Sequence, residues 1–220
     1  MIEVTRYHDD KLIGRWLLIC AVTIFGMILL GGVTRLTESG LSMVDWQPIM
    51  GVIPPLSTAD WVYLFEQYKL FPEYQLINTG MSLDEFKQIF WFEYLHRVLG
   101  RFIGLLFFFP LMAFLWMGKV HPRLKPHLFA LLILGGCQGL MGWYMVQSGL
   151  VDRPDVSQYR LTAHLGLAIA IYGYIVWLTI GLFSPERTIR LGHASAALSL
   201  VPLVYLMILT GGFVAGTNAG

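Results

Sequence analysis

The stretch WLLICAVTIFGMILLGGVT, residues 16–34, contains no charged residue and decides the fold class of this chain. A helix that crosses a bilayer needs about 20 mostly apolar residues at about 1.5 Å of rise each. The run is longer than the apolar core of a signal peptide, about 7–15 residues, and no small-x-small cleavage site follows it. We therefore predict an uncleaved membrane-spanning helix at the start of the chain.

Four later segments are also apolar and contain few or no ionisable residues. Residues 128–151 and 194–220 contain no charge, and residues 161–184 contain one histidine, His164. A shorter apolar run at 102–118 extends toward the N-terminus through aromatic residues. Five spans are predicted, near residues 14–35, 91–117, 127–148, 160–182 and 194–215. The fold class is therefore an all-α polytopic membrane protein.

The composition supports the same class. Of the 220 residues, 56% are hydrophobic and 13% are charged, whereas soluble domains carry about 25% charged residues. The mean hydropathy is +0.62. A net charge of +1 provides no basic field for nucleic acid, and two cysteines do not make a disulfide scaffold. Membrane lipid is the expected surrounding, and nucleic acid is excluded as a partner.

The distribution of lysine and arginine predicts the orientation. The long loop 37–90 has two lysines against seven carboxylates, whereas three other connecting segments are basic. Their basic residues are Arg6, Lys11, Arg15, Lys119, Arg123, Lys125, Arg187 and Arg190. The N-terminus is therefore expected in the cytoplasm, in the inner membrane of a bacterium, and the acidic loop and the C-terminus outside.

The outer loop is expected to be helical, because it is longer than a plain connector. Ser57 with Asp60 and Ser82 with Glu85 are capping-box patterns. The first box precedes apolar residues at helical spacing, which predicts a helix along the membrane surface. The second predicts a helix that continues into the second span. A packed lid without chemistry is the alternative reading of this loop.

A short motif recurs along the chain. Gly31, Gly32, Thr37 and Gly40 reappear after an offset of 180 residues. The repeat predicts a four-helix transmembrane unit over 1–184 and, over 185–220, the first helix of an incomplete second unit, so that the chain looks truncated after its fifth span. Chance similarity is the alternative, because small residues are common where membrane helices pack.

Ionisable residues gather at the outer ends of the spans. The second and fourth spans both enter from outside, so His96 and His164 are expected at similar depth on different helices. Ionisable groups inside a membrane are costly and by default functional. Two imidazoles that face each other across a bundle can ligate both faces of a haem iron. Two histidines hydrogen-bonded at the interface are the alternative.

Three arginines and one carboxylate are expected near the level of His96 and His164. Arg35, Arg97 and Arg101 are candidates for pairing with the two haem propionates, because guanidinium groups bind carboxylates in bidentate fashion. The alternative is that they snorkel to the interface. Glu93 lies one turn before His96 on the same predicted face. Aromatic walls for the ring are expected from Phe90, Trp91, Tyr94 and Phe102.

The remaining histidines and the cysteines are given no role in the site. His8, His121, His127 and His193 are expected in solvent. Cys20 and Cys137 are predicted to be small packing residues. Their different depths along the spans argue against a disulfide.

At this point the sequence resembles the haem A synthase family, in the branch found in proteobacteria and mitochondria. The resemblance covers essentially the whole chain, in order. Its matching segments are GGVTRLTESGLS (31–42), WQP (46–48), EYLHR (93–97), GR (100–101), QGLMGWYMV (138–146) and RLTAH (160–164).

The resemblance implies an oxidoreductase that converts haem O to haem A for terminal oxidases, by successive hydroxylation of one ring methyl to a geminal diol that loses water. It implies eight spans in two halves. His96 and His164 would hold the substrate haem, with Glu93 as the essential carboxylate beside it. A second histidine pair, for a haem b, is missing because no histidine follows His193. Expected partners are haem O synthase, an electron donor, a separate second half and a second copy of the chain.

Two other functions stay open. A bis-histidine haem b protein could carry electrons without modifying its haem, although such a carrier does not require Glu93. An inactive half would need its C-terminal half as a separate chain. A transporter fits poorly, because the polar cluster lies at one face and not at the midplane.

Overall fold

The structure is a computed structural model that describes residues 2–44, 50–151, 154–184, 191–217 and 219. Every regular element in these ranges is helical. The elements, in chain order, are α1 (Ile2–Leu36), the 3₁₀ turn η1 (Met50–Val52), α2 (Thr58–Tyr68), α3 (Pro72–Leu76), α4 (Leu83–Trp116), α5 (Lys125–Gln147), α6 (Gln158–Phe183) and α7 (Leu191–Gly216). The predicted all-α class is confirmed.

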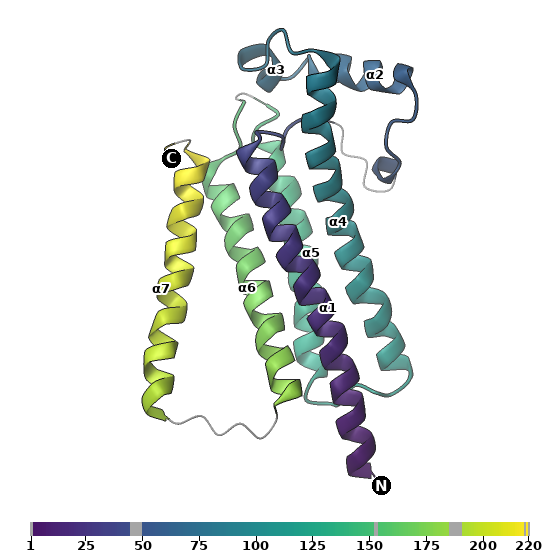
Figure 1. The fold of residues 1–220 in the computed structure, drawn as a ribbon, viewed down its shortest axis with the longest axis vertical. Coiled ribbons are helices and arrows are strands. Elements are labelled where there is room, and N and C mark those ends of the chain that lie inside the picture. The colour runs from purple at the N-terminus through teal and green to yellow at the C-terminus, as the bar shows by residue number, and fades with distance from the viewer. Residues whose placement is uncertain (1, 45–49, 152–153, 185–190, 218, 220) are drawn as a thin grey trace.

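Five of these helices are long and apolar enough to cross a membrane. The segments that qualify are Asp9–Leu36, Leu83–Trp116, Lys125–Gln147, Gln158–Phe183 and Leu198–Gly216, which confirms the five predicted spans. The two ends of the chain lie at opposite ends of the bundle (Figure 1). The protein is therefore a multi-pass integral membrane protein.

The helix of the second span begins earlier than residue 91, where the apolar run predicts its start. α4 begins at Leu83, directly after the Ser82 cap. The Ser82 hydroxyl accepts a hydrogen bond from the Glu85 N–H at 3.3 Å, and Glu85 Oε2 accepts one from the Ser82 N–H at 2.7 Å. The capping box thus starts a continuous helix that projects beyond the bundle (Figure 1), as the sequence predicts.

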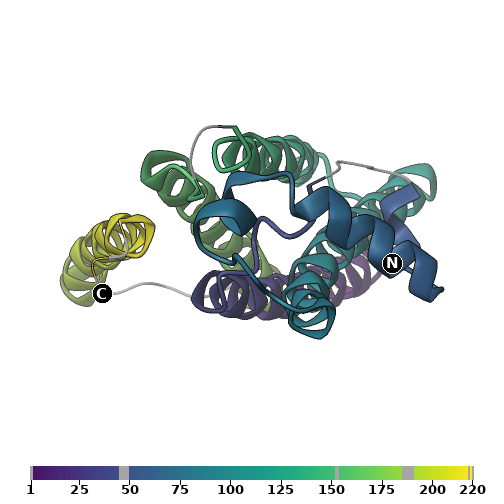
Figure 2. The ribbon, with the colours of Figure 1, turned by 90° about the horizontal axis from the view of Figure 1, so that it is seen from above.

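Four helices form a bundle with a definite order. α1 packs against α4 and α6, and α5 packs against α6 and more weakly against α4. In the part of the chain that the structure describes, α4 and α6 share almost no direct contact. They therefore occupy opposite corners of the bundle, and α7 packs outside it against α6 (Figure 2).

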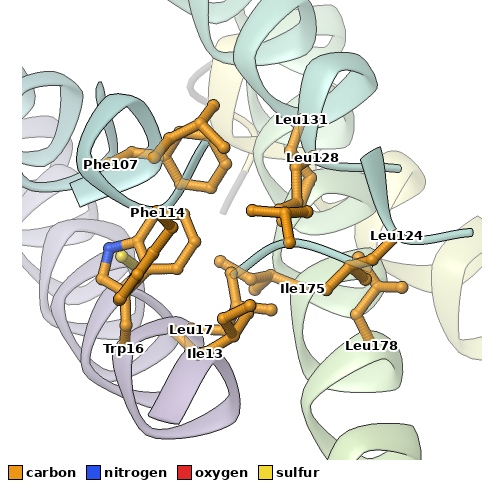
Figure 3. Close-up of a cluster of buried hydrophobic side chains, with 14 of the residues drawn as sticks. Ile13, Trp16, Leu17, Phe107, Phe114, Leu124, Leu128, Leu131, Ile175 and Leu178 are labelled. Atoms are coloured by element: carbon orange, nitrogen blue, oxygen red, sulfur yellow. The ribbon is translucent and has the colours of Figure 1, made fainter. Parts of the chain in front are cut away.

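The inner half of the bundle is filled by one apolar core. It contains Leu17, Leu111 and Leu128, all fully buried, together with Ile13 and Ile175 (Figure 3). Trp16 closes it on one side, and its indole N–H donates to the Leu106 carbonyl at 2.9 Å. Lipid tails are as apolar as these side chains, so this core stabilises the bundle through van der Waals packing between the helices.

This core stops halfway along the helices. No side chain is buried between residues 22 and 33 of α1, 95 and 106 of α4, or 132 and 147 of α5. On the outer half of α6, Thr162 and Gly166 are buried, and both contact α7. The apolar core therefore does not extend to the level of the two histidines.

Residues 50–82 form an outer lid over the bundle. α2 and α3 lie across the outer end of α4 (Figure 1), and the lid packs on α4 through an aromatic cluster. Its buried members are Phe65, Tyr68, Phe86, Phe90 and Tyr94. Ser57 caps α2, and its hydrogen bonds to Asp60 lower the pKa of that carboxyl. The prediction of a structured loop is confirmed.

The prediction that aromatic side chains of α4 form walls around the haem ring is wrong. Phe90 and Tyr94 pack against the lid, where the Tyr94 hydroxyl donates to the Val52 carbonyl at 2.6 Å. Trp91 and Phe102 are 39% and 51% exposed. Because α4 extends beyond the bundle, Phe86, Phe90 and Tyr94, which lie in its first four turns, serve the lid and not the interior.

α7 lies close to α6 because small residues meet at their interface. A Cβ atom at Gly216 would come within 2.6 Å of the Gln158 Cα, and one at Gly212 within 3.1 Å of the Thr162 hydroxyl oxygen. Glycine at such positions allows the backbones to approach. Arg35 of α1 also donates a hydrogen bond to the Ala215 carbonyl of α7, and these two positions are related by the 180-residue offset of the motif.

The two cysteines have different surroundings. Both thiols are free, in agreement with the prediction that they do not form a disulfide. Cys20 is buried in the inner core, as expected for a packing residue. Cys137 is exposed on α5, so the packing role predicted for it is wrong. α5 turns this position away from the bundle, which the spacing of apolar residues did not reveal.

Candidate functional site

The turn at the end of α1 brings Ser42 to α4. Glu38, two residues after the helix ends at Leu36, adopts a left-handed conformation with φ of 51°. The Ser39 N–H donates to the Thr34 carbonyl at 3.0 Å and the Glu38 N–H to the Arg35 carbonyl at 3.2 Å. This is the Schellman arrangement, and it turns the chain so that Ser42 reaches α4.

Glu93 is the buried carboxylate of the site. It is 3% exposed. Its Oε2 accepts hydrogen bonds from the Ser42 hydroxyl at 2.8 Å and from the Met43 N–H at 2.7 Å. Its Oε1 accepts from the Arg97 guanidinium, from Nε at 3.0 Å and also from Nη2. The carboxylate is therefore fixed from two sides, in an ion pair whose members are one helical turn apart.

Arg97 bridges α4 and the segment after α1. Besides pairing with Glu93, its Nη2 donates to the Met43 carbonyl at 2.9 Å. A charged side chain in a largely buried position requires such partners. The guanidinium of Arg97 therefore holds Glu93 and the Met43 backbone together at the outer end of the bundle.

His96 and His164 lie on opposite corners of the bundle, on α4 and α6. Both side chains are half-buried. The Nδ1 atom of each is buried and has no hydrogen-bond partner among the described residues. Buried polar atoms in proteins are nearly always hydrogen-bonded, so each imidazole has a ring nitrogen whose hydrogen-bonding capacity is unsatisfied among the described residues.

A glycine of the neighbouring helix faces each imidazole. A Cβ atom at Gly31 of α1 would lie 3.1 Å from the His96 Cε1, and one at Gly142 of α5 would lie 3.0 Å from the His164 Cε1. The side chain of Gln138, one turn before Gly142, lies 3.4 Å from the His164 Nε2 and donates to the His164 carbonyl at 3.1 Å. Gly31, Gln138 and Gly142 lie in segments that carry the family resemblance, but the sequence predicts no contact of theirs with a histidine.

The residues present fit a haem on three counts. Each of two imidazoles on diagonal helices has an unpaired buried nitrogen, and neutral imidazole is an axial ligand of haem iron. The apolar core stops below their level. Each imidazole lies against a helix position that a side chain would fill.

The two other candidate arginines lie at the margin of this site. Arg35 is near the end of α1 and binds the Ala215 carbonyl, as described above. Arg101 is one turn beyond Arg97 on α4 and is partly buried. The three guanidinium groups thus come from α1 and from one face of α4.

The expectation that His127 lies in solvent is wrong. Its Nδ1 is hydrogen-bonded to the Tyr174 hydroxyl at 2.6 Å, and its ring packs against Trp177 with the ring centroids 5.9 Å apart. It therefore ties α5 to α6 at the inner end. His121 is partly exposed, and its Nδ1 accepts from the Arg123 N–H at 3.2 Å. The side chains of His8 and His193 lie outside the described residues.

The lid contains a second buried carboxyl that the sequence analysis counted only among the loop's acidic residues. Glu73 is 5% exposed and accepts a hydrogen bond from the Tyr68 hydroxyl at 2.8 Å. Asn78 donates to the same hydroxyl at 2.8 Å. Burial raises the pKa of Glu73 to about 8, with a smaller contribution from nearby carboxylates. Those carboxylates are Glu93, Glu38 and Asp155.

The fold and this site define an all-α polytopic membrane protein that concentrates buried ionisable groups in the outer half of a four-helix bundle. A family model described as COX15-CtaA, cytochrome oxidase assembly protein, matches residues 14–220. The chain belongs to this family, and the predicted resemblance to haem A synthases is confirmed.

Curated relatives carry the name heme A synthase. The protein of Nitrosospira multiformis is 53% identical over 98% of this chain and 62% of its own length. Those of Nitrosomonas eutropha and Agrobacterium fabrum are 51% and 53% identical, over 98% and 96% of this chain and 62% and 59% of their own lengths. The chain thus spans about three fifths of the length of these relatives. No solved structure matches it.

Proposed function

We propose that this chain binds haem O in the outer half of its bundle and oxidises one ring methyl group to a formyl group, in haem A biosynthesis. The observation that carries the proposal is the pair of imidazoles on diagonal helices, each with a buried nitrogen that lacks a hydrogen-bond partner among the described residues. Relatives with the printed name heme A synthase support the same chemistry.

In this proposal His96 and His164 hold the ring and fix its position. Both imidazoles project from rigid helices whose inner halves are locked by the apolar core. A fixed ring presents one edge to the same protein groups in every turnover, which lowers the entropic cost of reaction. Bound haem O supplies the methyl group that is oxidised.

In this proposal Glu93 either orients a proton or transfers one at the edge of the haem ring that reacts. It lies one turn before His96 on α4, and Ser42, Met43 and Arg97 fix its two oxygen atoms. A carboxylate held by preorganised donors needs no reorganisation when charge or protons move beside it. The hydrogen bonds to Glu93 therefore support a role that depends on the fixed position of the carboxylate as well as on its charge.

Arg35, Arg97 and Arg101 are the proposed partners of the propionates. A guanidinium has five donors, so Arg97 can keep Glu93 and still donate to a second carboxylate. The three side chains come from α1 and one face of α4, which assigns the propionate edge to the α1–α4 side of the bundle. The opposite edge then faces α5 and α6.

The orientation proposed here puts the N-terminus in the cytoplasm and the lid outside the inner membrane of a bacterium. The basic inner segments and the acidic lid support it. In net terms, a methyl group and one water give a formyl group, four protons and four electrons. The reaction therefore needs a supply of haem O, water as the source of the formyl oxygen, and an acceptor for the electrons. A haem O synthase, a redox partner, a separate second half and a second copy of the chain are the corresponding proposed partners.

The test is to express the 220-residue chain, with and without a polypeptide that corresponds to the remaining length of its relatives, in cells that make haem O. Pigment extracted from the purified protein is then separated and its mass measured. Haem bearing a formyl group in either preparation supports the proposal. Only unmodified haem in both would favour an electron carrier, and a colourless protein that takes up no added haem would exclude the site.

A further inference from the structure

The imidazole of each candidate haem ligand lies against a glycine of the neighbouring helix. The imidazole of His96 faces Gly31 of α1, and that of His164 faces Gly142 of α5. Cβ atoms built on these glycines would lie 3.1 Å and 3.0 Å from the respective Cε1 atoms, closer than ordinary van der Waals contact. At the neighbouring positions Gly32 and Gly139, a Cβ atom would meet nothing within 4 Å.

The two glycines occupy the same depth on two helices of the same direction. Gly31 precedes the last residue of α1, Leu36, by five positions. Gly142 precedes the last residue of α5, Gln147, also by five positions. α1 packs against α4, and α5 packs against α6. The bundle therefore presents two equivalent histidine–glycine contacts on opposite sides of its interior.

We propose that Gly31 and Gly142 are positioning residues that set the ring orientations of His96 and His164 for haem ligation. The inference rests on the proposed function, which makes these histidines the ligands of haem O. The far end of each imidazole is the group that a methyl at the glycine would strike. Since the backbone is not struck, the helix can accept alanine, and the imidazole must turn enough to move its Cε1 by a few tenths of an ångström.

Rotation of the ring changes ligation without unfolding the bundle. An axial ligand binds through one ring nitrogen, whose direction follows the side-chain torsions. Groups that orient a metal ligand typically change metal affinity about 10–100-fold when they are altered. Alanine also favours helix over glycine, so the substitutions do not weaken the helices through their intrinsic propensity.

The experiment compares Gly31→Ala and Gly142→Ala with the matched controls Gly32→Ala and Gly139→Ala in the 220-residue chain. Purified protein is titrated with ferric protoporphyrin IX, and the low-spin spectrum is recorded by absorption and electron paramagnetic resonance. The target variants should bind about 10–100-fold more weakly, with shifted low-spin g-values. The controls should match the unaltered protein. Target variants indistinguishable from the controls would overturn the inference.

A second measurement does not need haem. Gly142→Ala should lower the melting temperature of the haem-free protein when His164 is present, and should not lower it in a His164→Ala background. Gly31→Ala should behave in the same way toward His96→Ala. Additive effects in both cycles would show that the contacts do not matter, and would overturn the inference even if a variant were too unstable to load with haem.

The two proposals fail in different ways. If His96→Ala and His164→Ala keep the full low-spin spectrum, the histidines are not the ligands and the proposed function is wrong. If these variants lose the spectrum while Gly31→Ala and Gly142→Ala keep it with unchanged affinity, the histidines are ligands. In that case the glycines do not position them, and only the further inference is wrong.

Discussion

Arg97 reaches back one turn along α4 to Glu93, and the pair is joined to the segment after α1 through both partners. Glu93 accepts from Ser42 and Met43, and Arg97 donates to the Met43 carbonyl. The side chains of Glu93 and Arg97 are 4% and 17% exposed. The ion pair thus closes the outer end of the α1–α4 interface and places a carboxylate one turn from His96.

Glu93→Gln is expected to keep haem bound and to stop its oxidation. The amide retains the shape of the carboxylate, and its oxygen can still accept from Ser42 and Met43, whereas its NH2 group loses the hydrogen bonds from Arg97. The histidines are separate side chains, so haem stays bound. The amide cannot take up a proton as a carboxylate does. The measurement is the ratio of haem A to haem O in extracted pigment, together with haem content. Normal haem A production by this variant would refute the proposed role.

Arg97→Ala is expected to destabilise the protein by about 3 kcal/mol, because it leaves the Glu93 carboxylate buried without its charged partner. The free energy of unfolding is measured in detergent by denaturant titration. The double variant with Glu93→Gln should recover part of this loss, since no buried charge then remains. A loss in the double variant equal to the sum of the single losses would show that the ion pair contributes nothing.

His96→Ala and His164→Ala are each expected to abolish the bis-histidine absorption spectrum, because either change removes one axial ligand. Added imidazole should restore part of the low-spin spectrum by filling the vacated space. His127→Ala is the matched control, since that histidine binds Tyr174 at the inner end of the bundle. It should leave the spectrum intact, and a comparable loss there would indicate a general effect on folding.

The buried carboxyl of the lid predicts a dependence of stability on pH. The pKa of Glu73 is raised from 4.5 to about 8 in the folded protein, so between these values the folded state holds a proton that the unfolded state has lost. The free energy of unfolding should therefore fall as the pH rises from about 4.5 to about 8. Thermal melts across this range should show that slope.

Glu73→Gln should flatten the slope, because the amide hydrogen-bonds to Tyr68 without titrating. Glu66→Gln is the control, since Glu66 lies on the same lid with its side chain 58% exposed in an ion pair with Lys69. The control should retain the slope of the unaltered protein. An unchanged slope in Glu73→Gln would assign the pH dependence to another group.

The membrane spans could be predicted from sequence because span formation depends on local hydrophobicity. The capping box at Ser82 likewise predicted that α4 extends outside the membrane, since capping depends on residues three apart. The common level of His96 and His164 followed from the alternating direction of the spans.

The side-chain contacts could not be predicted in the same way. The faces that Gly31 and Gly142 present depend on how each helix is rotated against its neighbour, and the nearly uniform hydrophobicity of the spans does not specify this rotation. The bond between His127 and Tyr174 and the burial of Glu73 beneath Tyr68 are also long-range or depend on the fold of the lid. Exposure of Phe102 follows from the same rotation of α4.

The restriction of the apolar core to the inner half has a mechanical consequence. The apolar core joins the four helices firmly at one end of the bundle. At the end that carries the lid, polar links join the segment after α1 to α4, and Gln138 of α5 to His164 of α6. α5 meets α4 only weakly, so this seam is the least costly place to separate two helices.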